Sequence, residues 1–183
     1  MDNGASSYHR FLMGDEEGFR EIIEMYSVKL VYFIKGFVMN MDVAEEIMED
    51  TFCDLIVYKG RYKGQSSFKT YLFSIARNKA YDYMKHRNRE NYSIDKAYEL
   101  TGDKRMENSI IKDENDRHVY TAMCNLKSEY KVLLYLLYFE QLTYDEAGKI
   151  LKKTNKQIKN LAYSARKSLK MILEKEGFEY EEY

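Results

Sequence analysis

The residues of this chain that are best suited to chemistry are aromatic, amide and basic side chains that recur at helical spacing. Steps of three or four residues place one such set on a single helix face: Tyr71, Ser74, Asn78, Tyr81 and Lys85. Aromatic rings stack on unpaired bases, an amide can read a base edge, and cations contact phosphates. The same spacing also fits rings that only pack in a core, but the neighbouring cations favour a surface for unstacked nucleic acid.

A second basic face lies near the C-terminus, where residues 155–175 predict a helix. Its exposed stripe is expected to carry Lys156, Lys159, Tyr163, Arg166 and Lys170, opposite an apolar stripe that includes Ile158 and Ala162. Upstream, Thr143 and Glu146 form a capping-box pattern for a short helix that ends near residue 151, and a turn over 152–154 follows. A short helix, a tight turn and a basic helix are typical of a helix-turn-helix that enters the major groove. An ordinary helical hairpin is the alternative.

Charge is sorted along the chain, although the net charge is only −1. Residues 59–90 carry nine Lys or Arg against two acidic residues, and residues 149–175 carry nine against one. The two segments are therefore +7 and +8, and the remainder of the chain is −16. Two polyanion-binding surfaces on an otherwise acidic molecule favour nucleic acid as the partner.

Residues 42–56 predict an amphipathic helix with one wholly acidic face. The apolar side carries Ala44, Ile47, Met48, Thr51, Phe52, Leu55 and Ile56, and the acidic side carries Asp42, Glu45, Glu46, Glu49 and Asp50. A solvated helix face normally mixes charges for i,i+4 pairing, so a docking surface for a basic partner competes with the simpler interpretation of a solvated helix. A carboxylate-bridged di-metal site is disfavoured because this helix has no His.

Composition sets the outer limits of the fold and of its chemistry. The 183 residues include no Pro, few Gly and 45% hydrophobic residues, which favours long helices with their own cores. The longest apolar run, residues 132–139, is far shorter than the roughly 20 residues of a membrane span, so we expect a cytoplasmic protein without membrane insertion. Cys53 and Cys124 are expected to be buried and reduced. The three His residues are scattered without the spacing of metal ligands, so we expect no metal site and no cofactor.

The chain divides into segments of different texture. Helical periodicity covers about residues 11–92, including a helix over 17–38 whose buried stripe contains Ile22, Ile23 and Tyr26, and a helix over about 67–89 with Ser66 or Ser67 as its N-cap. A second helical region contains an apolar helix over 126–140. We therefore predict an all-α protein with two small helical domains, 1–92 and 116–183, joined by a flexible linker over 93–115. The second domain ends in an acidic tail.

Three ordered segments resemble one known family, the bacterial sigma factors of the extracytoplasmic-function type. They are residues 42–52, residues 62–78, and residues 142–147 leading to Ala165-Arg166-Lys167. The resemblance implies a subunit that binds core RNA polymerase and directs it to promoters, with an anti-sigma protein as a further candidate partner. It implies that the first domain grips the polymerase and melts and reads the −10 element as single strand, and that the helix-turn-helix reads the −35 element as duplex.

The resemblance and the patterns above together give three sets of candidate site residues. The polymerase-binding set is Asp42, Glu45, Glu46, Glu49, Asp50 and Phe52. The −10 set is Tyr62, Lys63, Lys69, Tyr71, Arg77, Asn78, Tyr81 and Lys85. The −35 set is Thr154, Lys156, Gln157, Lys159, Asn160, Tyr163, Arg166 and Lys170.

The chain departs from the family pattern at several positions. The family usually has a Pro soon after the position of Leu126, often has Arg where Leu161 stands, and commonly has Trp where Tyr71 stands. An autonomous helix-turn-helix regulator is the alternative function, but it leaves the first domain and its acidic helix unexplained. An enzyme is disfavoured because the sequence offers no nucleophile–base pair, phosphate loop or metal constellation.

Overall fold

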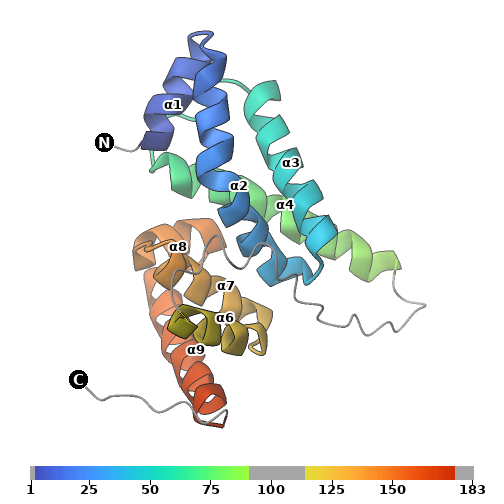
Figure 1. Cartoon of the computed structure of the whole chain (residues 1–183), viewed down its shortest axis with the longest axis vertical. Helices are drawn as coiled ribbons and strands as arrows, with labels where there is room; N and C mark the ends of the chain where they lie inside the picture. Colours follow the sequence, from blue (N-terminus) through green and yellow to red (C-terminus); the bar gives the residue numbers. More distant parts are fainter. Residues whose placement is uncertain (1–2, 91–113, 176–183) are drawn as a thin grey trace.

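The computed structural model describes residues 3–90 and 114–175, and within these ranges the chain is helical without a strand. The all-α prediction is therefore confirmed for the described residues. The elements in chain order are α1 (Asn3–Leu12), α2 (Glu16–Val38), α3 (Met41–Val57), α4 (Phe68–Glu90), α6 (Glu114–Cys124), α7 (Ser128–Leu134), the π-helical turn η1 (Tyr135–Phe139), α8 (Tyr144–Leu151) and α9 (Asn155–Lys175) (Figure 1). The predicted linker at 93–115 lies almost entirely outside the described residues, as does the acidic tail, and α6 already begins at Glu114.

Side-chain caps fix where several helices begin. Asp15 accepts a hydrogen bond from the backbone N–H of Glu17, and Asn40 does the same for Val43 at the start of α3. Ser67 accepts from the backbone N–H of Thr70 at 3.2 Å, which confirms it as a cap of α4. Each of these short polar side chains satisfies a donor that the first helical turn leaves without an intrahelical partner.

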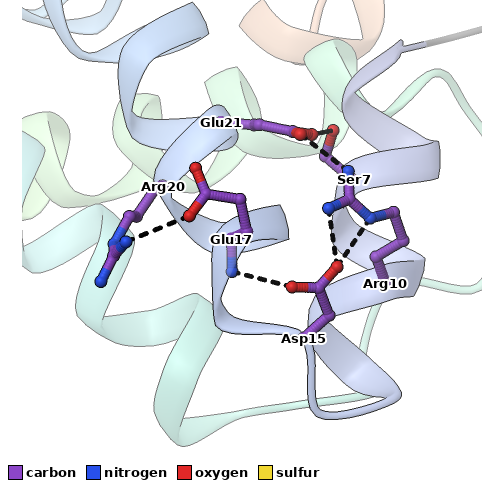
Figure 2. A network of polar contacts seen from close by, with 6 residues as sticks. All are labelled: Ser7, Arg10, Asp15, Glu17, Arg20 and Glu21. Carbon is purple, nitrogen blue, oxygen red and sulfur yellow. Dashed lines mark hydrogen bonds and ion pairs between the residues drawn. The ribbon is translucent and has the colours of Figure 1, made fainter.

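Helix α1 was not expected from the sequence, and a polar network ties it to α2 (Figure 2). Arg10 forms ion pairs with Asp15 at 2.6 Å and with Glu21 at 2.7 Å, and Ser7 donates a hydrogen bond to Glu21. Hydrogen bonds from Arg10 lower the pKa of Asp15, and those from Ser7 and then Arg10 lower the pKa of Glu21. The two helices cross so closely that a Cβ on Gly18 would lie only 2.3 Å from the carbonyl oxygen of Ser7.

Helices α2, α3 and α4 bury most of the predicted apolar stripes, with some corrections. Ile23 and Ile56, which we expected in the core, are 37% and 44% exposed. Cys53 is also exposed rather than buried, and both Cys are free thiols. Phe52, expected at the polymerase-binding surface, is only 6% exposed and packs in the core, where its ring lies 6.3 Å from that of Phe19. Phe52 therefore supports the helix from inside rather than contacting a partner directly.

The apolar helix predicted over residues 126–140 is shorter and ends differently. It begins at Ser128 as α7 and passes into η1, where the backbone N–H of Glu140 bonds to the carbonyl of Tyr135 five residues earlier. This wider turn stacks the Tyr135 ring on Phe139 and brings the Tyr135 hydroxyl within 3.2 Å of the Glu140 carboxylate. A π turn cannot be read from periodicity, because it inserts one residue into a 3.6-residue repeat.

The N-terminal helices α1–α4 and the C-terminal helices α6–α9 pack directly on each other through α2 and α4 on one side and α7 and α8 on the other (Figure 1). At the α2–α7 crossing a Cβ on Gly36 would lie 2.9 Å from Cγ2 of Val132, and Ser128 donates a hydrogen bond to the Gly36 carbonyl. The Tyr135 hydroxyl donates to the carbonyl of Lys29 at 3.1 Å. One apolar core therefore runs through both groups of helices.

Candidate partner and nucleic-acid surfaces

The acidic face of α3 is exposed, as the sequence predicted. Asp42, Glu46, Glu49 and Asp50 are open to solvent, and Glu45 is half-buried. The face continues into apolar residues, because Cys53 and Ile56 follow Glu46 and Glu49 by seven residues, which is two helical turns. Val57 is 69% exposed beside them. A carboxylate row that leads into exposed apolar side chains is typical of a protein interface rather than of a solvated helix.

The loop before α4 is closed by a cluster of aromatic rings. The ring of Tyr62 lies 5.1 Å from Tyr71, 5.4 Å from Phe68 and 6.1 Å from Tyr8, measured between centroids. The Tyr62 hydroxyl donates to the carbonyl of Ser66 at 2.8 Å, and burial raises the pKa of Tyr71. Tyr62 and Tyr71 are thus half-buried, so only their outer edges are open to a nucleic acid.

Further along α4, three predicted residues share one small surface. The guanidinium of Arg77 lies 3.8 Å from the centroid of the Tyr81 ring, and its Nη1 donates to Asn78 Oδ1 at 3.3 Å. Tyr81 is 40% exposed and its ring lies 5.4 Å from Phe37. Lys85 of α4 and Lys63 of the loop before it are also exposed. An aromatic ring, an amide and a cation within contact distance could accept an unstacked base together with its phosphate.

Lys69 is the predicted −10 residue whose surroundings differ most from the expectation. Its Nζ lies 2.6 Å from Glu140 Oε2 and donates to the carbonyl oxygen of Glu140 at 2.9 Å. The Glu140 side chain is 2% exposed and the Lys69 side chain 22%. In this arrangement Lys69 joins the two groups of helices and is not available to DNA. The neighbouring Ser67 reaches Glu146 at 3.4 Å across the same boundary.

The turn between α8 and α9 has the tight geometry of a helix-turn-helix. Thr143 and Glu146 form the predicted capping box, and their hydrogen bonds lower the pKa of Glu146 against the opposing effect of burial. Helix α8 ends at Leu151, and its C-cap Lys152 is left-handed with a φ of 54°. A Cβ on Gly148 of α8 would lie 2.8 Å from the carbonyl oxygen of Lys153, so the turn can fold back this closely only because the helix has Gly there. Thr154 caps α9, because its Oγ1 accepts from the backbone N–H of Gln157 at 3.3 Å.

Helix α9 presents the predicted basic face to solvent. All eight residues of the predicted −35 set are exposed, and Tyr163 is 71% exposed. Ile158, Ala162 and Ala165 are buried on the opposite side, which confirms the two-stripe pattern. One cation of this face already has an acidic neighbour, because Lys170 Nζ lies 3.7 Å from Glu174 Oε1. A basic face on a helix that follows a tight turn can lie along a groove of duplex DNA.

Arg166 is the most firmly held residue of this face. Its Nε donates to the Tyr138 hydroxyl at 2.6 Å and its Nη2 donates to the Tyr144 hydroxyl at 2.8 Å. Neither Tyr was singled out as functional from the sequence, since Tyr138 stands in an apolar run that predicted only core. Tyr138 is 53% exposed and belongs to the η1 turn, which the sequence pattern did not indicate.

The described residues contain neither a metal-binding cluster nor a membrane-spanning helix. No cluster of three or more His, Cys, Asp or Glu side chains suited to a metal ion occurs there. Among the same residues, no helix combines the length and the apolar character that a bilayer crossing requires.

Comparisons with known proteins give matches to RNA polymerase sigma factors. Residues 22–90 match the family described as Sigma-70 region 2. The chain is 27% identical over 157 residues to the ECF RNA polymerase sigma factor SigM of Bacillus subtilis, with 83% of this chain and 93% of that protein covered. It is 23% identical over 175 residues to the RNA polymerase sigma-H factor of Pseudomonas aeruginosa, with 90% and 91% covered.

Two solved structures share the fold at low sequence identity. One is the sigma factor RpoE in complex with the anti-sigma factor NepR from Bartonella quintana, with a TM-score of 0.68, 20% identity, and 85% of this chain and 96% of that chain covered. The other is CnrH in complex with the cytosolic domain of CnrY, with a TM-score of 0.65, 17% identity, and 94% and 98% covered.

Proposed function

We propose that this chain, a sigma factor of the extracytoplasmic-function type, binds core RNA polymerase and directs it to promoters. The observation that carries the proposal is the presence of three chemically different surfaces on one helical scaffold. They are the acidic and apolar face of α3, the half-exposed ring, amide and cation of α4, and the exposed basic face of α9. A DNA-binding regulator that acts alone needs only the last of these. The function is one of binding and positioning, without covalent chemistry by the chain itself.

The chemistry of each surface supports a separate role. The face of α3 suits a basic partner with an apolar contact area, and we assign it to the polymerase. The group formed by Arg77, Asn78 and Tyr81 suits single-stranded bases of the −10 element. The exposed side of α9 suits duplex DNA of the −35 element. We also infer that the chain works in the cytoplasm and that an anti-sigma protein is a candidate partner, as NepR is for RpoE in the solved complex.

Charge reversal on α3 tests the assignment of the polymerase surface. Glu46 and Glu49 are exposed, and replacing both with Lys leaves the buried stripe of Ile47 and Leu55 intact. We expect Glu46→Lys/Glu49→Lys to fold normally but to lose co-purification with core polymerase, because like charges would then meet across the interface. Helical content is measured by circular dichroism on the same preparation.

A matched control separates the position of the charge from its amount. Glu16→Lys/Glu24→Lys makes the same charge change on exposed residues of α2 and should leave polymerase binding unaltered. A folded α3 double variant that binds core polymerase as tightly as the parent protein would refute the docking assignment.

A footprint on promoter DNA distinguishes this function from that of an autonomous regulator. We expect the chain to protect one asymmetric site, and only with core polymerase present. A symmetric footprint made by the chain alone would instead identify a dimeric regulator, because a two-fold dimer reads two equivalent half-sites.

A further inference from the structure

The guanidinium of Arg166 is held by two hydroxyl groups that come from outside its own helix. Tyr138 belongs to η1 and Tyr144 is the first residue of α8, so three elements meet at this one side chain. The donor–acceptor distances of 2.6 Å and 2.8 Å engage Nε and Nη2, which lie on the same edge of the planar guanidinium. Two hydrogen bonds to one edge fix both the position and the plane of the group.

Holding the Arg166 side chain in one conformation costs conformational entropy, and in the folded chain this loss has already occurred before any ligand binds. A free Arg side chain carries about 2 kcal/mol of rotamer entropy, and a contact made by a mobile side chain must overcome it. The two bonds to Tyr138 and Tyr144 use two of the five N–H donors of the group, so its remaining donors can still face solvent. Arg166 is thus ordered and exposed at the same time.

The partners of Arg166 are neutral, unlike those of several other bound cations of the chain. Lys69 pairs with Glu140, Lys153 with Glu129 and Arg10 with two carboxylates, so the charge of each is offset. Hydroxyl groups position Arg166 without offsetting its charge. A fixed guanidinium that keeps its full charge is suited to a phosphate group, which accepts parallel N–H bonds from the free edge.

We propose that Tyr138 and Tyr144 are positioning residues that hold Arg166 for contact with a backbone phosphate of duplex DNA. The inference rests on the proposed function, because it takes the exposed face of α9 as the duplex-binding surface. Lys159 precedes Arg166 by seven residues and therefore lies on the same side of α9 two turns away, where it reaches the same duplex. The two Tyr residues contribute through Arg166 and not through contacts of their own.

The test is a double-mutant cycle on the full chain, with a short mixed-sequence DNA duplex as the probe because phosphate contacts do not depend on sequence. Tyr138→Phe and Tyr144→Phe should each weaken duplex binding by about three- to tenfold, the value of one hydrogen bond. In an Arg166→Ala background the same substitutions should have no further effect. Arg166→Ala should also lower the slope of log affinity against log salt by about one, since one phosphate contact is lost.

Three further measurements distinguish a positioning role of the two Tyr residues from a purely structural role and from a failure of the α9 assignment. Tyr130→Phe removes a hydroxyl from α7 in the same group of helices and should bind duplex like the parent chain. If the Phe variants at 138 and 144 lose thermal stability but keep their duplex affinity, the cluster is only a strut between helices and the inference is overturned. The same holds if their effects persist in the Arg166→Ala background. If Lys159→Glu also leaves duplex affinity unchanged, the duplex-binding assignment of α9 fails as well.

Discussion

The ion pair between Lys69 and Glu140 offers a direct test of how the two groups of helices are joined. Lys69→Met keeps most of the aliphatic stem but removes the ammonium group, which leaves the Glu140 carboxylate 2% exposed and bonded only to the Tyr135 hydroxyl at 3.2 Å. Glu140→Gln keeps the shape and the contact with the Tyr135 hydroxyl, whose single proton is shared between residue 140 and the Lys29 carbonyl, but removes the negative charge. The carbonyl of Glu140 stays available to Lys69 in that variant, as it is in the parent chain.

The burial of Lys69 and Glu140 determines how much each substitution should lower the free energy of unfolding. Removing one partner of a fully buried pair costs about 3–5 kcal/mol, because the other charge remains without compensation. Lys69 is 22% exposed and Glu140 keeps one hydrogen bond, so we expect a loss near the lower limit, about 3 kcal/mol, for Lys69→Met. Glu140→Gln should cost less, about 1–2 kcal/mol, since it leaves no buried anion behind. The double variant should cost about 2 kcal/mol less than the sum of the single losses.

Urea unfolding of the full chain, followed by far-ultraviolet circular dichroism, measures these free energies. Lys63→Met is the matched control, because Lys63 is exposed on the same basic segment, and it should change the free energy of unfolding by less than about 0.5 kcal/mol. A loss below that value for Lys69→Met, together with additive effects in the double variant, would mean that the pair does not form in solution.

Three other substitutions test separate parts of the reasoning. Asn78→Ala should reduce open-complex formation on some promoters more than on others while polymerase binding persists, as measured by permanganate footprinting; a uniform loss would indicate a folding or phosphate role. Lys159→Glu should weaken duplex binding and flatten its salt dependence by about one counterion, with an unchanged melting temperature; an unaltered salt slope would remove Lys159 from the interface. Tyr135→Phe tests alkaline stability. Burial, and then the charge of Glu140, raise the Tyr135 pKa well above its ordinary 10.0. The folded state therefore retains a proton that the unfolded state loses, and the free energy of unfolding falls as pH rises above about 10. The Phe variant should show a shallower fall, and equal slopes would contradict this origin.

Much of the fold could be predicted because helix periodicity and caps are local properties of the sequence. The predicted bounds of α2, α4, α8 and α9 agree with the structure to within about one residue, and Thr143 and Thr154 cap the helices that they were expected to cap. Helix α1 was missed because few of its residues are apolar, and those few are buried through tertiary contacts that a local pattern does not contain. Tyr8 packs on Phe68, and Arg10 pairs with Glu21.

The candidate sites were predictable in outline but not in their contacts. Exposure of the α3 and α9 faces follows from periodicity, and both faces were predicted. Periodicity placed Phe52 on the apolar side of α3, where the structure has it, although Phe52 was also included in the polymerase-binding set. The partners of Lys69 and Arg166 depend on how distant helices meet and on the π turn before Glu140. A pattern within one helix contains no information about either.

The close packing of the two groups of helices is thermodynamically linked to promoter binding. Elements named −10 and −35 lie about 25 base pairs apart, which is roughly 85 Å along duplex DNA at 3.4 Å per base pair. Helices α2 and α4, with 23 residues each, are only about 35 Å long. If α4 and α9 read these two elements at once, we expect the contacts between the two groups of helices, such as Lys69 with Glu140, to open.

The packed chain and the promoter-bound chain are then two states of one equilibrium. Any free energy stored in the contacts of Lys69, Ser128 and Tyr135 is subtracted from the apparent affinity for a partner that requires the separated state. A ligand that prefers the packed state opposes the polymerase by the same linkage, without touching the surfaces that the polymerase or the DNA would use.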